Sequence, residues 1–327
     1  MTEPGVAHAA PAASAGSWVV GPTPPAVAEM VRSLELTITR RLDGVLHGHH
    51  EGLTPGHGSE PGESRVYQPG DDVRRIDWNV SARTNETYVR EQIADRDLTA
   101  WMVLDVSAAM RFGTTDNDKA HVASAAAATV GFLTARNQNR LAAVLVAGPE
   151  LRVLPPRSGA DQVRAILTAA AMSPDSTGQG LADLSGALAR VDALARRRGF
   201  VTVISDFAPD PAGPGGAPAW REPLGRLGLR HDLLAVVVDD PRERDVPPIG
   251  LVTLADPSTG RTREVRVTAE IQRRFADEVA AERVRRQDAI GRSGAELIEL
   301  STDDDWLGRI VQHVQRKRVQ AVRGGVI

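Results

Sequence analysis

The chain has 327 residues, of which 42% are hydrophobic and 25% are charged, values that are ordinary for a folded globular protein. The absence of cysteine excludes disulfides, thiolate metal sites and a cysteine nucleophile. A formal net charge of -3 provides no overall positive field to recruit nucleic acid, and no apolar run approaches the roughly 20 residues of a membrane span. We therefore expect a cytoplasmic protein with no membrane span and no nucleic-acid partner.

The first part of the chain divides into a tail and an N-terminal segment. Residues 1–23 are rich in Ala, Pro, Gly and Ser without periodicity, which predicts a disordered tail. Residues 26–42 carry apolar side chains at helical spacing and predict one helix or two short ones. Two extended stretches, 64–68 and 87–93, flank a region rich in turn residues. We interpret residues 24–98 as one segment that packs on the main domain.

From residue 99 onward, apolar strands alternate with helices, a pattern typical of a mostly parallel sheet covered on both faces. The sequence therefore predicts a doubly wound α/β domain over residues 99–327, including a C-terminal extension, and a hairpin around Ser258, Thr259 and Gly260. In such sheets, ligands bind beyond the carboxyl ends of the strands. The predicted strands are 99–104, 141–146, 151–154, 200–204, 232–238 and 296–300, and the predicted helices are 117–135, 160–171, 184–197, 220–227, 269–291 and 303–318.

Three polar residues follow the ends of two of these strands. Asp105 and Ser107 come directly after the first strand, and Asp206 comes directly after a later one. Two carboxylates and a hydroxyl at one edge of a sheet could hold Mg²⁺, which prefers oxygen ligands. The alternative is that Asp105 only caps a helix or forms hydrogen bonds within its own loop.

The same residues resemble the metal-ion-dependent adhesion site of von Willebrand factor A domains. That motif is Asp-x-Ser-x-Ser, with a Thr from a later loop and an Asp after a later strand; Asp105, Ser107 and Asp206 match three of these positions. Ala109 stands where the second Ser is expected and Ala182 where the Thr is expected. The resemblance implies a von Willebrand factor A-like fold. It also implies a degenerate site at which Mg²⁺ binds weakly or not at all, so that no cofactor is required.

A second cluster precedes the sheet domain and is unusually dense in Arg, Asp and aromatic residues. Its arginines could form forked ion pairs with its aspartates, and its tryptophan could serve as an anchor. The simpler interpretation is that the cluster fastens the N-terminal segment to the sheet domain. Its candidate residues are Tyr67, Pro69, Gly70, Asp71, Asp72, Arg74, Ile76, Asp77, Trp78, Asn79 and Arg83.

This cluster resembles the signature of the bacterial domain-of-unknown-function 58 family, Tyr-x-Pro-Gly-Asp-Asp-x-Arg-x-Ile-Asp-Trp-Asn. In that family the signature precedes a von Willebrand factor A-like domain, and here both halves occur in that order over roughly residues 33–240. The resemblance implies a partnership with a MoxR-type AAA+ ATPase in the chaperone-like assembly or remodelling of other proteins.

Three functions fit the sequence. The leading hypothesis is a non-enzymatic adaptor that binds other proteins, including a MoxR-type ATPase, through the strand-end residues. The first alternative is a Mg²⁺-dependent hydrolase of phosphoesters in which Asp77, Asp105 and Asp206 converge on the metal. The second is a structural scaffold with a vestigial metal site.

Overall fold

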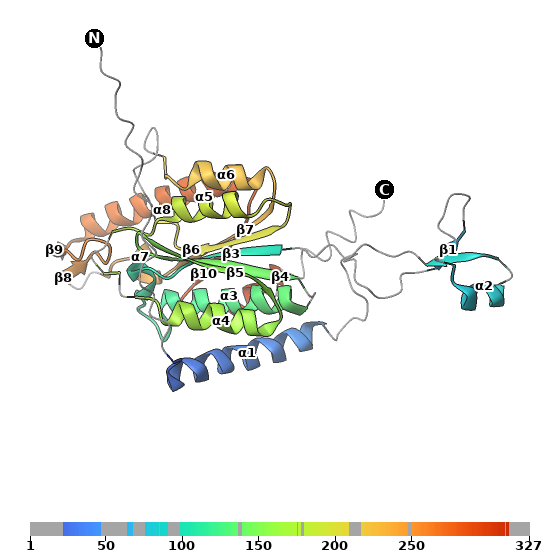
Figure 1. Cartoon of the computed structure of the whole chain (residues 1–327). Coiled ribbons are helices and arrows are strands. Elements are labelled where there is room, and N and C mark those ends of the chain that lie inside the picture. Colours follow the sequence, from blue (N-terminus) through green and yellow to red (C-terminus); the bar gives the residue numbers. More distant parts are fainter. Residues whose placement is uncertain are drawn as a thin grey trace, which may run out of the picture.

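A computed structural model of the chain describes residues 22–46, 64–67, 76–84, 86–90, 99–136, 139–174, 176–177, 180–208, 217–247, 250–310 and 312–313. Its centre is a six-stranded sheet in the order β10-β7-β6-β3-β4-β5 (Figure 1). The five strands from β10 to β4 are parallel, and β5 alone runs antiparallel at the edge. This topology confirms the predicted doubly wound, mostly parallel α/β sheet. The strands are β3 (Thr99–Asp105), β4 (Arg140–Ala147), β5 (Glu150–Ser158), β6 (Phe200–Ser205), β7 (Asp232–Asp239) and β10 (Glu296–Ser301).

The sheet is buried on both faces, which explains why its strands are apolar without interruption. In β3, Met102 and Leu104 belong to one core, whereas Trp101 and Val103 belong to the other, because successive side chains of a strand point to opposite faces. Helices cover each face (Figure 1). The first face carries α1 (Pro25–Leu46), α3 (Lys119–Arg136) and α4 (Ala160–Ala171), and the second carries α5 (Leu184–Leu194), α6 (Arg221–Gly228) and α8 (Ala269–Arg292).

The N-terminal helix α1 forms an outer layer on α3 and α4. It is one continuous helix, and its side chains Val31, Leu34 and Ile38 are buried in the first core. Each such buried side chain contributes about 1.5–3 kcal/mol to stability. At the surface, Arg164 of α4 donates two hydrogen bonds to the Glu35 carboxylate, at 2.8 and 2.6 Å. The helix is therefore joined to the sheet domain by apolar and ionic contacts.

A small unit of β1 (Ser64–Val66), α2 (Trp78–Thr84) and β2 (Tyr88–Arg90) precedes the sheet domain. β1 and β2 pair antiparallel. Helix α2, which the sequence pattern did not predict, begins after Asp77, whose Oδ1 accepts a hydrogen bond of 3.3 Å from the backbone N–H of Val80. Residues 47–63 before this unit, 68–75 within it and 91–98 after it lie outside the described residues, as do residues 1–21 of the predicted tail. The packing of this unit on the main domain therefore stays a prediction.

The predicted hairpin is present as β8 (Gly250–Ala255) and β9 (Thr262–Val267). Its turn reaches back to the carboxyl edge of the sheet, where the backbone N–H of Gly180 donates a hydrogen bond of 2.8 Å to the carbonyl of Ser258. Among the described helices, none is both long and apolar enough to cross a membrane.

Helix α6 packs closely against the turn that ends α8, and a substitution in α6 tests this contact. A Cβ atom added at Gly228 would collide with the carbonyl oxygen of Ser293, whereas one added at Gly225 of the same helix meets open space. We expect Gly228→Ala to lower the free energy of unfolding in urea by about 1–3 kcal/mol, because the backbone must shift. The control Gly225→Ala should raise it by about 0.5–1 kcal/mol through helix propensity. Equal stability of the two variants would contradict this packing.

Candidate functional site

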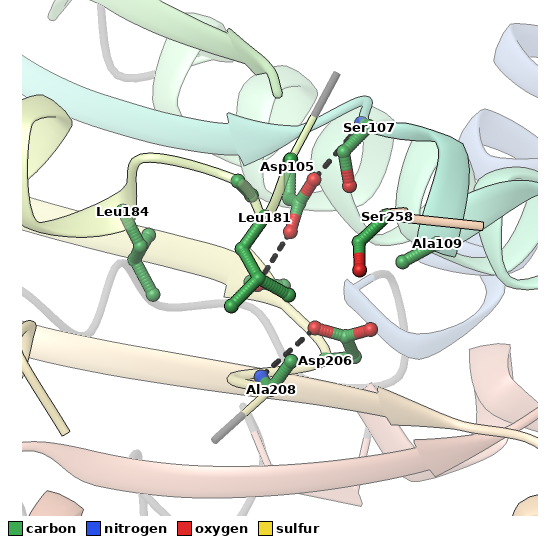
Figure 2. Close-up of a pocket in the computed structure, with 11 residues that line it drawn as sticks. Asp105, Ser107, Ala109, Leu181, Leu184, Asp206, Ala208 and Ser258 are labelled. Carbon is green, nitrogen blue, oxygen red and sulfur yellow. Dashed lines mark hydrogen bonds between the residues drawn. The ribbon is translucent and has the colours of Figure 1, made fainter. Parts of the chain in front are cut away.

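A pocket lies at the carboxyl ends of β3 and β6, where the sequence placed the candidate site (Figure 2). Asp105, Ser107 and Asp206 come together there, and Ala109 and Ala182 line the same pocket. The hairpin contributes a residue that sequence reasoning did not include. The lining residues are Asp105, Ser107, Ala109, Gly180, Leu181, Ala182, Leu184, Ser205, Asp206, Ala208 and Ser258.

Asp105 is a buried carboxyl held by two donors. Its Oδ1 accepts a hydrogen bond of 2.9 Å from the backbone N–H of Ser107, and its Oδ2 accepts one of 2.7 Å from the hydroxyl of Ser205. Burial, together with the nearby Asp206 charge, raises the pKa of Asp105 to about 6. The hydroxyl of Ser107 is buried and has no hydrogen-bond partner within the described part of the chain. Asp105 thus forms the loop hydrogen bond anticipated by the second interpretation of the sequence.

Lys119, the first residue of α3, provides a positive charge at the site. Its side chain is 1% exposed, and its Nζ donates to Asp206 Oδ2 at 3.0 Å and to Glu243 Oε1 at 2.6 Å. Burial alone would raise the pKa of Asp206, but the Lys119 ammonium lowers it below its usual value. Burial likewise opposes the charge of Lys119, but Asp206 and Glu243 raise its pKa. The three groups form a charged cluster.

Glu243 reaches Lys119 because a short helix cap holds it there. It lies in α7 (Pro241–Arg244), and its Oε2 accepts a hydrogen bond of 3.0 Å from the backbone N–H of Asp240. Asp240 in turn caps the helix by accepting from the backbone N–H of Arg242 at 2.8 Å. One carboxylate oxygen of Glu243 therefore completes a capping box while the other binds the ammonium.

The loop that carries Asp206 has an unusual backbone. Phe207 has a φ of 50°, a left-handed conformation that a bulky side chain rarely adopts. The turn brings the backbone N–H of Ala208 to within 3.0 Å of Asp206 Oδ1. The Phe207 ring is buried edge-on against Trp220, with ring centroids 5.2 Å apart. Core packing therefore holds Asp206 in a fixed position, and such local strain is common near functional sites.

One arginine and two threonines complete the charge network around the pocket. Arg286 of α8 donates to the carbonyl of Asp206 at 2.8 Å and to Asp239 Oδ2 at 3.0 Å. Burial opposes the ionisation of Asp240, but hydrogen bonds of 2.6 Å from the hydroxyls of Thr114 and Thr302 contribute to lowering its pKa. These contacts join the ends of β6, β7 and β10 to the loop before α3.

The residues present do not fit a divalent cation. Mg²⁺ takes near-octahedral oxygen coordination, but Ala109 and Ala182 supply no side-chain oxygen and Asp206 Oδ2 is already bound to Lys119. An added divalent ion would also be repelled by the ammonium. Within the described residues, no group of three or more His, Cys, Asp or Glu side chains could hold a metal.

The amino-acid sequence of this chain matches a known protein family. The family model described as "Protein of unknown function DUF58" matches residues 63–285. The chain belongs to this family. Uncharacterized proteins of Mycobacterium tuberculosis (strain ATCC 25618 / H37Rv) and of Mycobacterium bovis are each 43% identical to this DUF58 chain over 300 residues, covering 92% of this chain and 92% of each relative.

Solved structures similar to this DUF58 chain have low sequence identity to it. BatB of Bacteroides thetaiotaomicron is 13% identical, with a TM-score of 0.40, and the match covers 68% of this chain and 99% of BatB. The von Willebrand factor A domain of SpRpn10 is 12% identical, with a TM-score of 0.37, and the match covers 66% of this chain and 94% of that domain.

Part of the DUF58 signature builds the small N-terminal unit. The backbone N–H of Tyr67 donates a hydrogen bond of 2.7 Å to the carbonyl of Thr87, and that of Asp77 donates one of 2.8 Å to the carbonyl of Tyr88. Ile76 and Val89 form an isolated antiparallel β-bridge. Asn79 and Arg83 lie in α2. The remaining signature residues fall outside the described part of the chain: Pro69, Gly70, Asp71, Asp72 and Arg74.

The signature tryptophan lies at the surface of the small unit. Trp78 is 72% exposed, so it is not a buried anchor in the described structure. It is the first residue of α2, a helix of only seven residues, and its indole projects from the small unit instead of entering a core. Asp77 caps this helix and does not line the pocket of Asp105 and Asp206.

Sequence reasoning missed the partners that fix the two pocket aspartates. Lys119, Glu243, Ser205 and Arg286 all bond to Asp105 or Asp206, or to a residue that does. Composition offered one signal: Lys119 and Lys317 are the only lysines among 39 Lys and Arg residues. A lysine at the first position of a buried, Ala-rich helix is therefore exceptional in this chain.

Proposed function

We propose that this DUF58 chain is a non-enzymatic, cytoplasmic interaction protein that works with a MoxR-type AAA+ ATPase in the chaperone-like assembly or remodelling of other proteins. The family resemblance supplies the ATPase partner. The observation that supports an interaction role is the pocket itself, in which both aspartates are engaged by fixed donors of the same chain. Such a pocket offers a preformed surface instead of a free acid or base for catalysis.

The phosphoester hydrolase alternative requires a third carboxylate from the signature. Asp77 is used as the cap of α2 and does not line the pocket, so the observations favour the adaptor. A hydrolase would reveal itself by Mg²⁺-dependent turnover of a generic phosphoester that disappears in Asp105→Ala. We expect no turnover from the wild type.

A substitution of Leu181 tests whether the exposed surface around the pocket, here called the pocket face, binds the ATPase, and it leaves the buried charges of the pocket in place. This side chain lines the pocket and is 40% exposed. We expect tagged wild type, trapped in its host with a slowly hydrolysed ATP analogue, to recover a MoxR-type ATPase. Leu181→Glu should reduce that recovery at least about tenfold, because burying an unpaired carboxylate at an interface costs more than about 1.4 kcal/mol.

Leu229→Glu is the matched control for this experiment. Leu229 is 87% exposed and precedes β7, at the amino end of the sheet, so the same chemical change there should leave ATPase recovery at the wild-type level. Failure of the wild type to recover any such ATPase would contradict the adaptor proposal. Equal recovery by Leu181→Glu and wild type would remove the pocket face as the contact.

A further inference from the structure

We infer that the ammonium of Lys119 is a built-in replacement for the divalent cation of the adhesion-type site, so that the site works without metal. The inference concerns the chemistry of the pocket and does not depend on the adaptor role proposed above. It rests on the position of Lys119, on the two alanines of the pocket and on the choice of lysine over arginine.

Lys119 lies against Asp206 and is not among the residues that line the pocket. Its ammonium contacts Asp206, the late aspartate of the motif, and bridges it to Glu243 on another element. The lysine side chain is 1% exposed, and that of Asp206 is 12% exposed. A buried ammonium needs acceptors on several sides, and two carboxylates supply them here. The chain thus supplies the positive charge that Asp206 would otherwise take from solution.

The two alanines agree with an ammonium and not with a metal. A divalent ion needs oxygen atoms on every side, so a metal-binding pocket loses affinity when Ala109 and Ala182 replace Ser and Thr. An ammonium that is already bound to two carboxylates does not need those hydroxyls as further acceptors. The two alanines and Lys119 are therefore consistent with each other, because both suit a site that uses an ammonium and no metal.

The choice of lysine is also informative. The chain uses arginine almost everywhere, yet a lysine occupies the most buried cationic position among the described residues. Lysine carries a compact point charge with three rotatable donors, whereas arginine carries a broad planar fork. A compact charge fits between the carboxylates of Asp206 and Glu243.

Mn²⁺ binding, followed by electron paramagnetic resonance and by the melting temperature, tests the inference in four proteins. Wild type should bind no stoichiometric Mn²⁺, and its melting temperature should not respond to millimolar Mn²⁺ or Mg²⁺. Restoring the hydroxyls in Ala109→Ser/Ala182→Thr should still give no binding, because Lys119 remains. Adding Lys119→Ala should increase Mn²⁺ affinity at least about tenfold over that double variant, and a further Asp105→Asn should abolish the gain.

Two results would overturn the inference. One is a stoichiometric Mn²⁺ site in wild type that is lost in Asp105→Asn. The other is an equal Mn²⁺ affinity with and without Lys119 in the hydroxyl-restored background. Either would mean that the Lys119 ammonium does not take over the role of the metal.

A measurement that needs only the wild type and the conservative variant Lys119→Arg covers the case in which another variant does not fold. With only two lysines, ¹⁵N-lysine labelling gives at most two ammonium signals, and the Lys119 signal is the one absent from Lys119→Arg. We expect that signal at neutral pH, because burial and ion pairing slow its proton exchange, and we expect Mg²⁺ to leave it unchanged. A Lys119 signal that shifts or disappears on addition of Mg²⁺ would show displacement by the metal and refute the inference.

Discussion

Replacing Lys119 with methionine should lower the free energy of unfolding at pH 7 by about 3–5 kcal/mol, because the change leaves two carboxylates without their buried cation. Methionine keeps much of the side-chain volume, so a cavity contributes little. Without the ammonium, burial should raise the pKa of Asp206. The variant should therefore become relatively more stable as the pH falls from 7 to 5 and the carboxyl takes up a proton. Urea denaturation at the two pH values measures both effects.

Arg198→Met is the control for this prediction. Arg198 forms an ion pair with Asp232 at 3.2 Å, but the two side chains are 79% and 71% exposed. Loss of such a surface pair should change stability by less than about 1 kcal/mol. If Lys119→Met were no more destabilising than Arg198→Met, the buried charge cluster would not contribute as the contacts indicate.

Asp105→Asn should have the opposite effect and stabilise the protein by about 2–3 kcal/mol at pH 8. Burial raises the pKa of Asp105 to about 6 from a usual 3.8, so at pH 8 the folded protein carries a buried charge that the unfolded chain solvates better. Asparagine can still accept from the N–H of Ser107, and the Ser205 hydroxyl can turn from donor to acceptor.

The sign of the pH dependence distinguishes this effect from a change in packing. Because the pKa of Asp105 is raised on folding, the wild type gains stability as the pH falls through 6. The advantage of Asp105→Asn should therefore shrink by roughly half between pH 8 and pH 5. Asp116→Asn, at an exposed loop position, should change stability by no more than about 0.5 kcal/mol at either pH. A less stable Asp105→Asn at pH 8 would show that another positive charge compensates Asp105.

The fold and the location of the pocket could be predicted because they depend on local patterns. Strands that are apolar without interruption predicted a sheet buried on both faces, and β3 has that burial in the structure. The carboxyl ends of parallel strands meet at one edge, so Asp105 and Asp206 could be placed together although the chain separates them widely. The pairing follows from topology alone.

The chemistry of the pocket could not be predicted because it depends on long-range contacts. Lys119 lies 87 residues from Asp206 and 124 residues from Glu243 in the sequence. Glu243 belongs to a four-residue helix that has no periodic signature. Only the strand order brings the start of α3 and the ends of β6 and β7 together, so that Lys119 contacts Asp206 and Glu243.

The exposure of the signature tryptophan has a local reason. Aromatic side chains are usually buried, but Trp78 begins a seven-residue helix, α2, that is too short to show apolar periodicity. The helix is set by the Asp77 cap, and a single capping residue is a weak signal beside the turn residues that surround it.

The burial of Lys119 also makes its amine a natural reporter of opening at this edge of the sheet. Acylating reagents modify free, unprotonated amines, and Lys119 is 1% exposed and held as an ammonium by two carboxylates. A reagent reaches it only in molecules in which the contacts between α3, β6 and α7 have separated. The rate at which the Lys119 peptide acquires an acyl group therefore measures how often this end of the native protein opens, without any engineered label.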